Sequence, residues 1–304
     1  MSAAPEPTRR LTVSDIAKLY ADGTRIAMLT AYDYPTARLL DEAGIPLLLV
    51  GDSLGEVVLG YDSTVRVTMA EMLHHTKAVV RGTQRALVIG DMPFLSYSTA
   101  DEAVENAGLF LREAGAQAVK VEGGVRSAKI VETLVRTGIP VMGHIGWTPQ
   151  AKLGMGGKVR VQGKSPEQAR ALLHDALAIQ EAGAFSIVLE LVPGQLAAAI
   201  TERLRIPTIG IGAGAGCSGE VQVVTDLLGL GSFIPRHARP YAGLRQTILD
   251  AARAYAADVE RGTFPGPDET VRMDDEILAE ALGQGQLDRP AIVPVGGIPL
   301  DRDL

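Results

Sequence analysis

The stretch Leu47-Leu48-Leu49-Val50-Gly51-Asp52-Ser53 contains a short apolar run that ends in an acidic residue. Three later runs repeat this pattern and end at Asp91, Glu122 and Glu190. Each run is rich in Val, Ile and Leu and precedes a helix-like segment, which is typical of buried parallel strands. Because the carboxyl ends of parallel strands meet at one end of the sheet, we expect these four acids to converge there.

Strand-like and helix-like segments alternate about eight times along the chain, which predicts a closed (β/α)8 barrel. An open doubly wound sheet is the alternative. That fold usually has a glycine-rich turn after its first strand, whereas the first strand here ends Ala31-Tyr32-Asp33. The expected strands span residues 25–32, 47–52, 86–91, 118–122, 140–145, 186–191, 207–212 and 220–225.

The ends of the chain flank this predicted barrel. Thr12 to Gly23 reads as an N-terminal helix that could plug the bottom of the barrel. We expect residues 1–265 to form a single (β/α)8 domain. Residues 266–304 turn acidic and then rich in Pro and Gly. We expect this C-terminal appendage to be partly disordered or to contact a neighbouring subunit.

Composition limits the classes of function. The 304 residues carry a net charge of −7, which argues against nucleic acid as the main partner. Cys217 is the single cysteine, so neither an internal disulfide nor a thiolate metal cluster is expected. The first ten residues have no apolar core and the longest apolar stretch, near 45–50, is too short to span a bilayer. We expect a cytoplasmic protein that acts on a small molecule.

Three of the strand-end acids predict a metal site. Asp52, Asp91 and Glu122 follow successive strands and offer hard oxygen ligands, which suit Mg²⁺. No cysteine set or His-x-x-x-His spacing points to zinc. The alternative is that each acid caps the helix that follows its strand.

Other polar residues at the strand ends could take part in chemistry. Lys120 shares a strand face with Glu122, so it could pair with a substrate carboxylate or with that neighbour. Glu190 lies among apolar residues, which predicts a general base or else a buried acid paired with a barrel Lys or Arg. His144 could donate to an oxyanion or a substrate, or serve as a hydrogen-bonded barrel residue.

Taken together, these motifs resemble the ketopantoate (3-methyl-2-oxobutanoate) hydroxymethyltransferase family. The matching stretches occur in the expected order over about residues 12–265. They are Thr30-Ala31-Tyr32-Asp33, Val50-Gly51-Asp52-Ser53-Leu54-Gly55, Gly60-Tyr61-Asp62-Ser63-Thr64, Gly90-Asp91-Met92-Pro93-Phe94, Val119-Lys120-Val121-Glu122-Gly123-Gly124, Gly143-His144-Ile145-Gly146, Thr148-Pro149-Gln150, Leu189-Glu190 and Ile209-Gly210-Ile211-Gly212-Ala213-Gly214.

The resemblance implies a (β/α)8 enzyme of pantothenate and coenzyme A biosynthesis. Such an enzyme transfers a hydroxymethyl group from 5,10-methylenetetrahydrofolate to 3-methyl-2-oxobutanoate through a Mg²⁺-stabilised enolate, giving 2-dehydropantoate. It also implies a homo-oligomer, commonly a decamer. The family's metal carboxylates correspond to Asp52 and Asp91, with Glu122 near the ion. Its substrate contacts correspond to Asp52, Ser53, Asp91 and Lys120, and its general base to Glu190.

Four departures and two alternatives accompany this resemblance. Pro235-Arg236-His237 replaces the family's usual Pro-Lys-Phe run, and the loop after Gln150 is one residue longer than usual, at Gly156-Gly157-Lys158-Val159-Arg160. Ser218 stands where the family usually has Asp, and Glu220 where it usually has Gln. A Mg²⁺-dependent lyase of the isocitrate lyase and phosphoenolpyruvate mutase group would use a similar enolate. Such lyases generally need a catalytic loop with Cys or another acid, whereas Cys217 follows the seventh strand. A non-catalytic binding protein would have little use for an intact set of acids.

Overall fold

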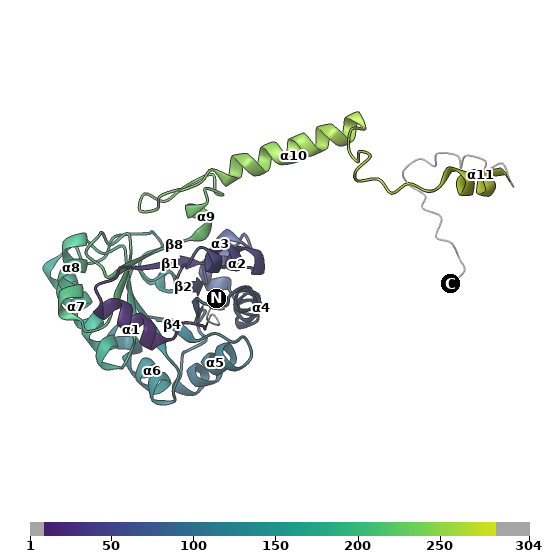
Figure 1. The fold of residues 1–304 in the computed structure, drawn as a ribbon. Coiled ribbons are helices and arrows are strands. Elements are labelled where there is room, and N and C mark those ends of the chain that lie inside the picture. The colour runs from purple at the N-terminus through teal and green to yellow at the C-terminus, as the bar shows by residue number, and fades with distance from the viewer. Residues whose placement is uncertain (1–8, 284–304) are drawn as a thin grey trace, which may run out of the picture. The chain divides into compact units, whose positions relative to one another are not determined.

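The computed structural model describes residues 9–283, and its centre is a closed barrel of parallel strands in sequence order (Figure 1). The predicted (β/α)8 barrel is thereby confirmed. Short runs of Val, Ile and Leu form the strands because each strand is covered by apolar groups on both faces. The strands are β1 (Ile26–Thr30), β2 (Leu47–Val50), β3 (Leu87–Asp91), β4 (Ala118–Glu122), β5 (Val141–Gly146), β6 (Ser186–Glu190), β7 (Thr208–Ile211) and β8 (Gly219–Gln222).

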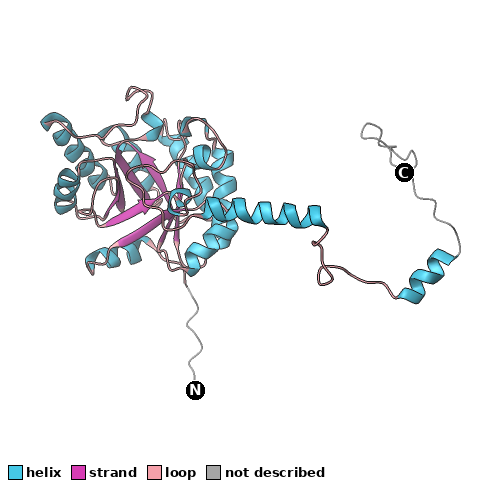
Figure 2. Ribbon diagram, turned by 90° about the horizontal axis from the view of Figure 1, so that it is seen from above, coloured by secondary structure: helices cyan, strands magenta, loops and turns pink. Residues whose placement is uncertain are grey.

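Helices surround this barrel and begin at the capping residues that the sequence contains (Figure 2). Thr68 and Thr99 each form a capping box with a Glu three residues later, which satisfies backbone N–H groups of the first turn. The long helices are α1 (Val13–Ala21), α2 (Tyr34–Glu42), α4 (Met69–Gly82), α5 (Ala100–Arg112), α6 (Val125–Arg136), α7 (Pro166–Glu181) and α8 (Gly194–Arg203). The shorter helical pieces are α3 (Leu54–Val57), η1 (Thr64–Arg66), η2 (Pro149–Ala151) and α9 (Val224–Leu227).

Helix α1 plugs the barrel, as predicted. Its Ile16 is fully buried and belongs to one cluster with inward-facing strand residues, among them Met28, Leu49 and Ile89. Strand residues of the opposite parity, such as Val88, pack instead in the larger cluster beneath the outer helices. Apolar side chains therefore fill the barrel from its amino-terminal end, and polar side chains gather at the carboxyl ends of the strands.

Strand register sets the level of those polar side chains. Asp91 on β3 pairs with Lys120 on β4, and Glu122 pairs with His144 on β5. Glu190 on β6 pairs with Gly146. Because paired residues lie side by side in a parallel sheet, residues far apart in sequence come together at one rim of the barrel.

The chain divides into two compact units, Met1–Arg245 and Gln246–Leu304. The second contains most of α10 (Leu244–Arg261) and α11 (Asp275–Gly283), helices without buried residues. The proposed division at residue 265 stays a prediction, and part of the appendage lies outside the described residues. Among the described helices, none is long and apolar enough to cross a membrane.

Candidate active site

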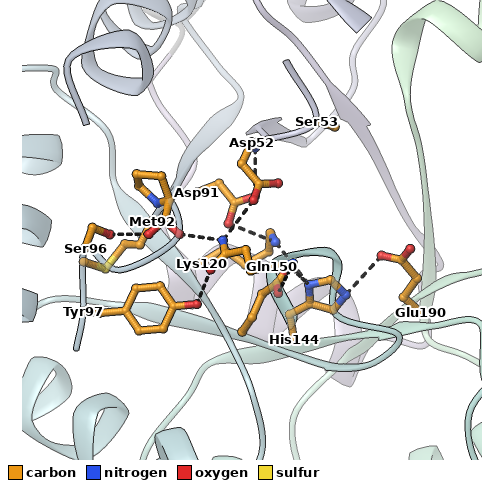
Figure 3. A network of polar contacts seen from close by, with 12 residues as sticks. Asp52, Ser53, Asp91, Met92, Ser96, Tyr97, Lys120, His144, Gln150 and Glu190 are labelled. Carbon is orange, nitrogen blue, oxygen red and sulfur yellow. Dashed lines mark hydrogen bonds and ion pairs between the residues drawn. The ribbon is translucent and has the colours of Figure 1, made fainter. Parts of the chain in front are cut away.

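Five charged side chains predicted from the sequence meet at the carboxyl ends of neighbouring strands, and Figure 3 labels four of them, Asp52, Asp91, Lys120 and His144. Each of these residues is between 1% and 4% exposed, so the group is removed from solvent. Buried charges are costly unless they are paired or bind an ion. The five residues are Asp52, Asp91, Lys120, Glu122 and His144.

Asp91 is the centre of the charged pairs on the β2–β4 side. Its Oδ1 lies 2.9 Å from Lys120 Nζ, and its Oδ2 accepts a hydrogen bond of 3.0 Å from the backbone N–H of Asp52. Burial raises the pKa of Asp91 to about 7 in spite of that ammonium. For Lys120, burial alone would lower the pKa, but the three surrounding carboxylates outweigh it and raise the pKa. Lys120 is therefore an ammonium whose ion-pair partner is Asp91, not the adjacent Glu122.

His144 links the buried acids to the cavity. Its Nδ1 lies 3.2 Å from Lys120 Nζ and 3.3 Å from Glu122 Oε1, and its Nε2 lies 3.2 Å from Glu190 Oε2. Burial and the charge of Lys120 oppose protonation, but the contacts with Glu122 and Glu190 raise the pKa of His144 to about 9. Nδ1 can accept from Lys120 when the ring is neutral or donate to Glu122 when it is charged. Nε2 carries a proton toward Glu190 in both cases.

Glu190 ends β6 and is the most accessible acid of the group, with 17% of its side chain exposed. Its backbone carbonyl accepts from Trp147 N at 2.8 Å, and Gly146 is packed so closely that a side chain there would collide with the same carbonyl. The next residue, Leu191, has a φ of 49°, which turns the chain sharply after the strand. No lysine or arginine of the described chain forms an ion pair with Glu190, so the alternative of an acid paired with a barrel Lys or Arg is wrong; its charged neighbour is His144.

Ser53 follows Asp52 and opens the short helix α3. Its Oγ lies 2.8 Å from the hydroxyl of Tyr32, a buried residue that the motif comparison noted without a role. Burial raises the pKa of Tyr32, so that the phenol keeps its proton. Ser53 lines the cavity, and Tyr32 holds its hydroxyl in place.

Two further residues were not predicted as part of the site. Gln150, in η2 after β5, donates from Nε2 to Asp52 Oδ2 at 2.9 Å, and its backbone N–H donates to Glu122 Oε2 at 3.1 Å. Tyr97, before α5, donates its hydroxyl to Gln150 Oε1. The Thr148-Pro149-Gln150 motif was the only sequence signal for Gln150, because its neighbours come from other strands.

The capping alternative is wrong for Asp52, Asp91 and Glu122, since none of them accepts from the helix that follows its own strand. Burial raises the pKa of both Asp52 and Asp91, and the charge of Glu122 adds to the rise at Asp52. Crowded buried carboxylates of this kind are stabilised by a divalent cation.

Buried polar atoms that have no hydrogen-bond partner also fit a site for a cation or an anionic ligand. Five buried side-chain polar atoms of the described chain make no hydrogen bond, and three belong here: Asp91 Oδ1, Glu122 Oε1 and His144 Nε2. Each has only a charged neighbour. Over the same residues, no three His, Cys, Asp or Glu side chains are grouped as a ready-made cage. The buried, crowded carboxylates of Asp52 and Asp91 fit an ion held by few carboxylates, with oxygens of water or ligand completing its shell, as Mg²⁺ prefers.

The site opens into a cavity of about 960 Å³. The buried acids, Lys120 and His144 line its floor, whereas apolar Val159 and Phe233 contribute to its walls. Three cations also line it, Lys152, Arg160 and Arg236, and within the described chain none forms an ion pair. The cavity thus combines a compact polar floor with a wider apolar and cationic mouth.

Comparison with known proteins identifies the relatives of this chain. A sequence model described as ketopantoate hydroxymethyltransferase matches residues 10–267. The chain belongs to the ketopantoate hydroxymethyltransferase family. A 3-methyl-2-oxobutanoate hydroxymethyltransferase of Chloroflexus aurantiacus is 63% identical over 90% of this chain and 97% of that protein. The protein of that name from Dehalococcoides mccartyi is 56% identical over 89% of this chain and 96% of its own length.

Solved structures extend the likeness at the level of fold. A phosphoenolpyruvate phosphomutase from Streptomyces platensis aligns with a TM-score of 0.56 at 16% identity, over 90% of this chain and 96% of that one. A 2,3-dimethylmalate lyase aligns with a TM-score of 0.54 at 17% identity, over 90% of this chain and all of that one. At such low identity the likeness shows only a shared barrel fold, and it gives no information about activity. The family assignment is therefore unchanged.

Proposed function

We propose that this protein transfers a hydroxymethyl group from 5,10-methylenetetrahydrofolate to 3-methyl-2-oxobutanoate and so forms 2-dehydropantoate for pantothenate biosynthesis. The relatives named for this activity support it. The observation that carries it is the contact of His144 with Glu190 above the buried acids, because it joins a candidate base to a charged site. The predicted homodecamer and the cytoplasmic location stay predictions.

Lys120 and Ser53 would bind the carboxylate of the 2-oxo acid. Lys120 is a buried ammonium at the floor of the cavity, and Ser53 presents a hydroxyl that Tyr32 holds at 2.8 Å. Asp52 and Asp91 would hold Mg²⁺, with Glu122 beside it. When bound, the ion would supply Lewis acidity toward the oxygens of the 2-oxo acid.

Glu190 would remove the proton from C3 of the substrate. Its carboxylate is the one acid of the group that is partly open to the cavity. His144 Nε2, 3.2 Å away, orients that carboxylate and can help to share the proton. In the overall reaction the C3–H bond and the two C–N bonds of the folate methylene bridge break. The freed carbon bonds to C3 and to the oxygen of a water, and the protons released from C3 and from the water go to the two folate nitrogens, giving tetrahydrofolate.

The wide mouth of the cavity would bind the folate. A volume of about 960 Å³ lies near the upper end of the range for drug-sized ligands, roughly 300–1,000 Å³, and far exceeds the need of a five-carbon acid. Phe233 and Val159 are apolar and exposed, which suits an aromatic ring system. Arg160 and Arg236 have no ion-pair partner in the described chain, which suits the glutamate carboxylates of a folate.

Proton nuclear magnetic resonance in D₂O tests the first half-reaction. Incubation of the protein with 3-methyl-2-oxobutanoate should replace the C3 proton with deuterium, and removal of Mg²⁺ should abolish the exchange. If none of the divalent ions tested supports exchange, the proposed substrate or mechanism is refuted. Turnover with and without methylenetetrahydrofolate then separates transfer from cleavage of a 2-oxo or 2-hydroxy acid, which needs no folate.

A further inference from the structure

Gln150 connects the ends of four strands through one buried side chain and its own backbone. Its residue is 6% exposed, and Nε2 donates to Asp52 Oδ2 and to the carbonyl of Met92, both at 2.9 Å. Its Oε1 accepts from the hydroxyl of Tyr97, and its backbone N–H donates to Glu122 Oε2. Both amide protons and the amide oxygen are therefore in use.

The orientation of this amide is fixed by its partners. A carboxylate and a carbonyl can only accept, so they require the Nε2 end of Gln150, and Oε1 must face Tyr97. The nearby turn supports Tyr97, because Ser96 Oγ donates to Pro93 O at 2.7 Å and Asn106 donates to Ser96 O at 2.7 Å. A flipped amide would leave two acceptors without donors.

Gln150 donates a hydrogen bond to only one carboxylate oxygen of Asp52 and to only one of Glu122. Gln150 holds Oδ2 of Asp52 and Oε2 of Glu122, whereas Oε1 of Glu122 is buried without a hydrogen bond. Two carboxylates from different strands are thereby held at a defined orientation relative to each other. Neutral amide donors achieve this without adding another negative charge to the crowded floor.

We propose that Gln150, braced by Tyr97, is a positioning residue that orients the carboxylates of Asp52 and Glu122 for a divalent ion. The proposal rests on the metal site of the proposed function. Partners that orient metal ligands typically contribute about 10- to 100-fold to metal affinity when they are removed by mutation. Gln150 is not among the residues that line the cavity, so it would act through the two carboxylates.

Titration of ion-free full-length protein with Mn²⁺, followed by electron paramagnetic resonance, tests this role. Gln150→Met keeps the volume but removes the amide, and it should weaken Mn²⁺ binding roughly 10- to 100-fold. Gln180→Met is the matched control. Gln180 is 7% exposed and does not line the cavity. Its Oε1 accepts a hydrogen bond from the backbone N–H of Arg205, and its Nε2 donates to Glu181 Oε1. It should lose thermal stability but keep the wild-type affinity.

Equal Mn²⁺ affinity in Gln150→Met and wild type would overturn the proposal, and so would an equal loss in Gln180→Met. Tyr97→Phe provides a second variant if Gln150→Met does not fold. It removes one hydroxyl and should weaken binding roughly threefold or more, whereas unchanged affinity in the folded variant would also overturn the role. A wild-type protein that binds no Mn²⁺ would instead refute the metal site itself, and with it both proposals.

Discussion

Nε2 of His144 lies 3.2 Å from Oε2 of Glu190, and this contact joins a partly open carboxylate to a buried network of charges. The Glu190 side chain is 17% exposed, whereas that of His144 is 3% exposed. A base must reach a substrate proton and still be held in place. Glu190 can reach the substrate because its carboxylate is partly open to the cavity, and the buried His144 holds that carboxylate in place.

Replacement of Glu190 by Gln should abolish most proton abstraction. The amide keeps the shape of the side chain but cannot accept the C3 proton, so deuterium exchange should fall roughly 10²- to 10⁴-fold. Proton nuclear magnetic resonance of 3-methyl-2-oxobutanoate in D₂O measures the rate. Glu56→Gln, at another acid that lines the same cavity, should exchange within about twofold of wild type. Wild-type exchange in Glu190→Gln would exclude Glu190 as the base.

Replacement of Lys120 by Met should destabilise the fold. The change leaves Asp91 buried without its cation, and loss of one partner from a buried pair costs about 3–5 kcal/mol. Denaturant unfolding of the ion-free protein gives the free energy of unfolding. Lys129→Met removes one of the two ion-pair partners of Glu132 on an exposed face and should cost about 1 kcal/mol or less. Similar losses in the two variants would contradict the importance of the Lys120–Asp91 pair.

Replacement of Arg236 and Arg160 by Ala should affect the folate and spare the 2-oxo acid. We expect the KM for methylenetetrahydrofolate to rise roughly tenfold, about the effect of losing one charge-assisted hydrogen bond. Deuterium exchange at C3 should stay at the wild-type rate, because it needs no folate. Arg203→Ala, at the end of α8 and outside the cavity, should change neither quantity. An unchanged KM would remove these arginines from the proposed folate site.

Glu220 should make stability depend on pH. Burial raises its pKa from 4.5 to about 7, against the opposing charge of Arg25. Between these pH values the folded state binds a proton that the unfolded state releases, so the free energy of unfolding falls as pH rises. Above pH 7 the folded protein carries the full cost of the buried charge.

Glu220→Gln, which removes the titrating carboxyl group, should therefore raise the Tm at pH 8 and leave it nearly unchanged near pH 4. Thermal unfolding at the two pH values measures the difference. Glu202→Gln, on the exposed end of α8, should shift the Tm at neither pH. A Glu220→Gln variant with a lower Tm at pH 8 would show that the ionised carboxylate stabilises the fold.

Local sequence patterns were enough to predict the barrel and most of the charged floor. The repeated pattern of an apolar run, an acid and a capped helix depends on local chemistry, which one sequence displays. Asp52, Asp91 and Glu122 could be grouped in advance because parallel strands of one barrel end at the same rim. The predicted bounds of the eighth strand, 220–225, were less accurate. The strand spans Gly219–Gln222, and α9 begins at Val224.

Which of these residues are in contact follows from the packing of the barrel. The sequence left open whether Lys120 pairs with Glu122, and the barrel places it 2.9 Å from Asp91 instead. Tyr97 had no sequence signal and Gln150 had only its motif, because a hydrogen-bond partner as far away in sequence as Asp52 is from Gln150, 98 residues, leaves no trace in spacing or periodicity. The physical reason is that strand order and register, not distance along the chain, bring donors and acceptors together.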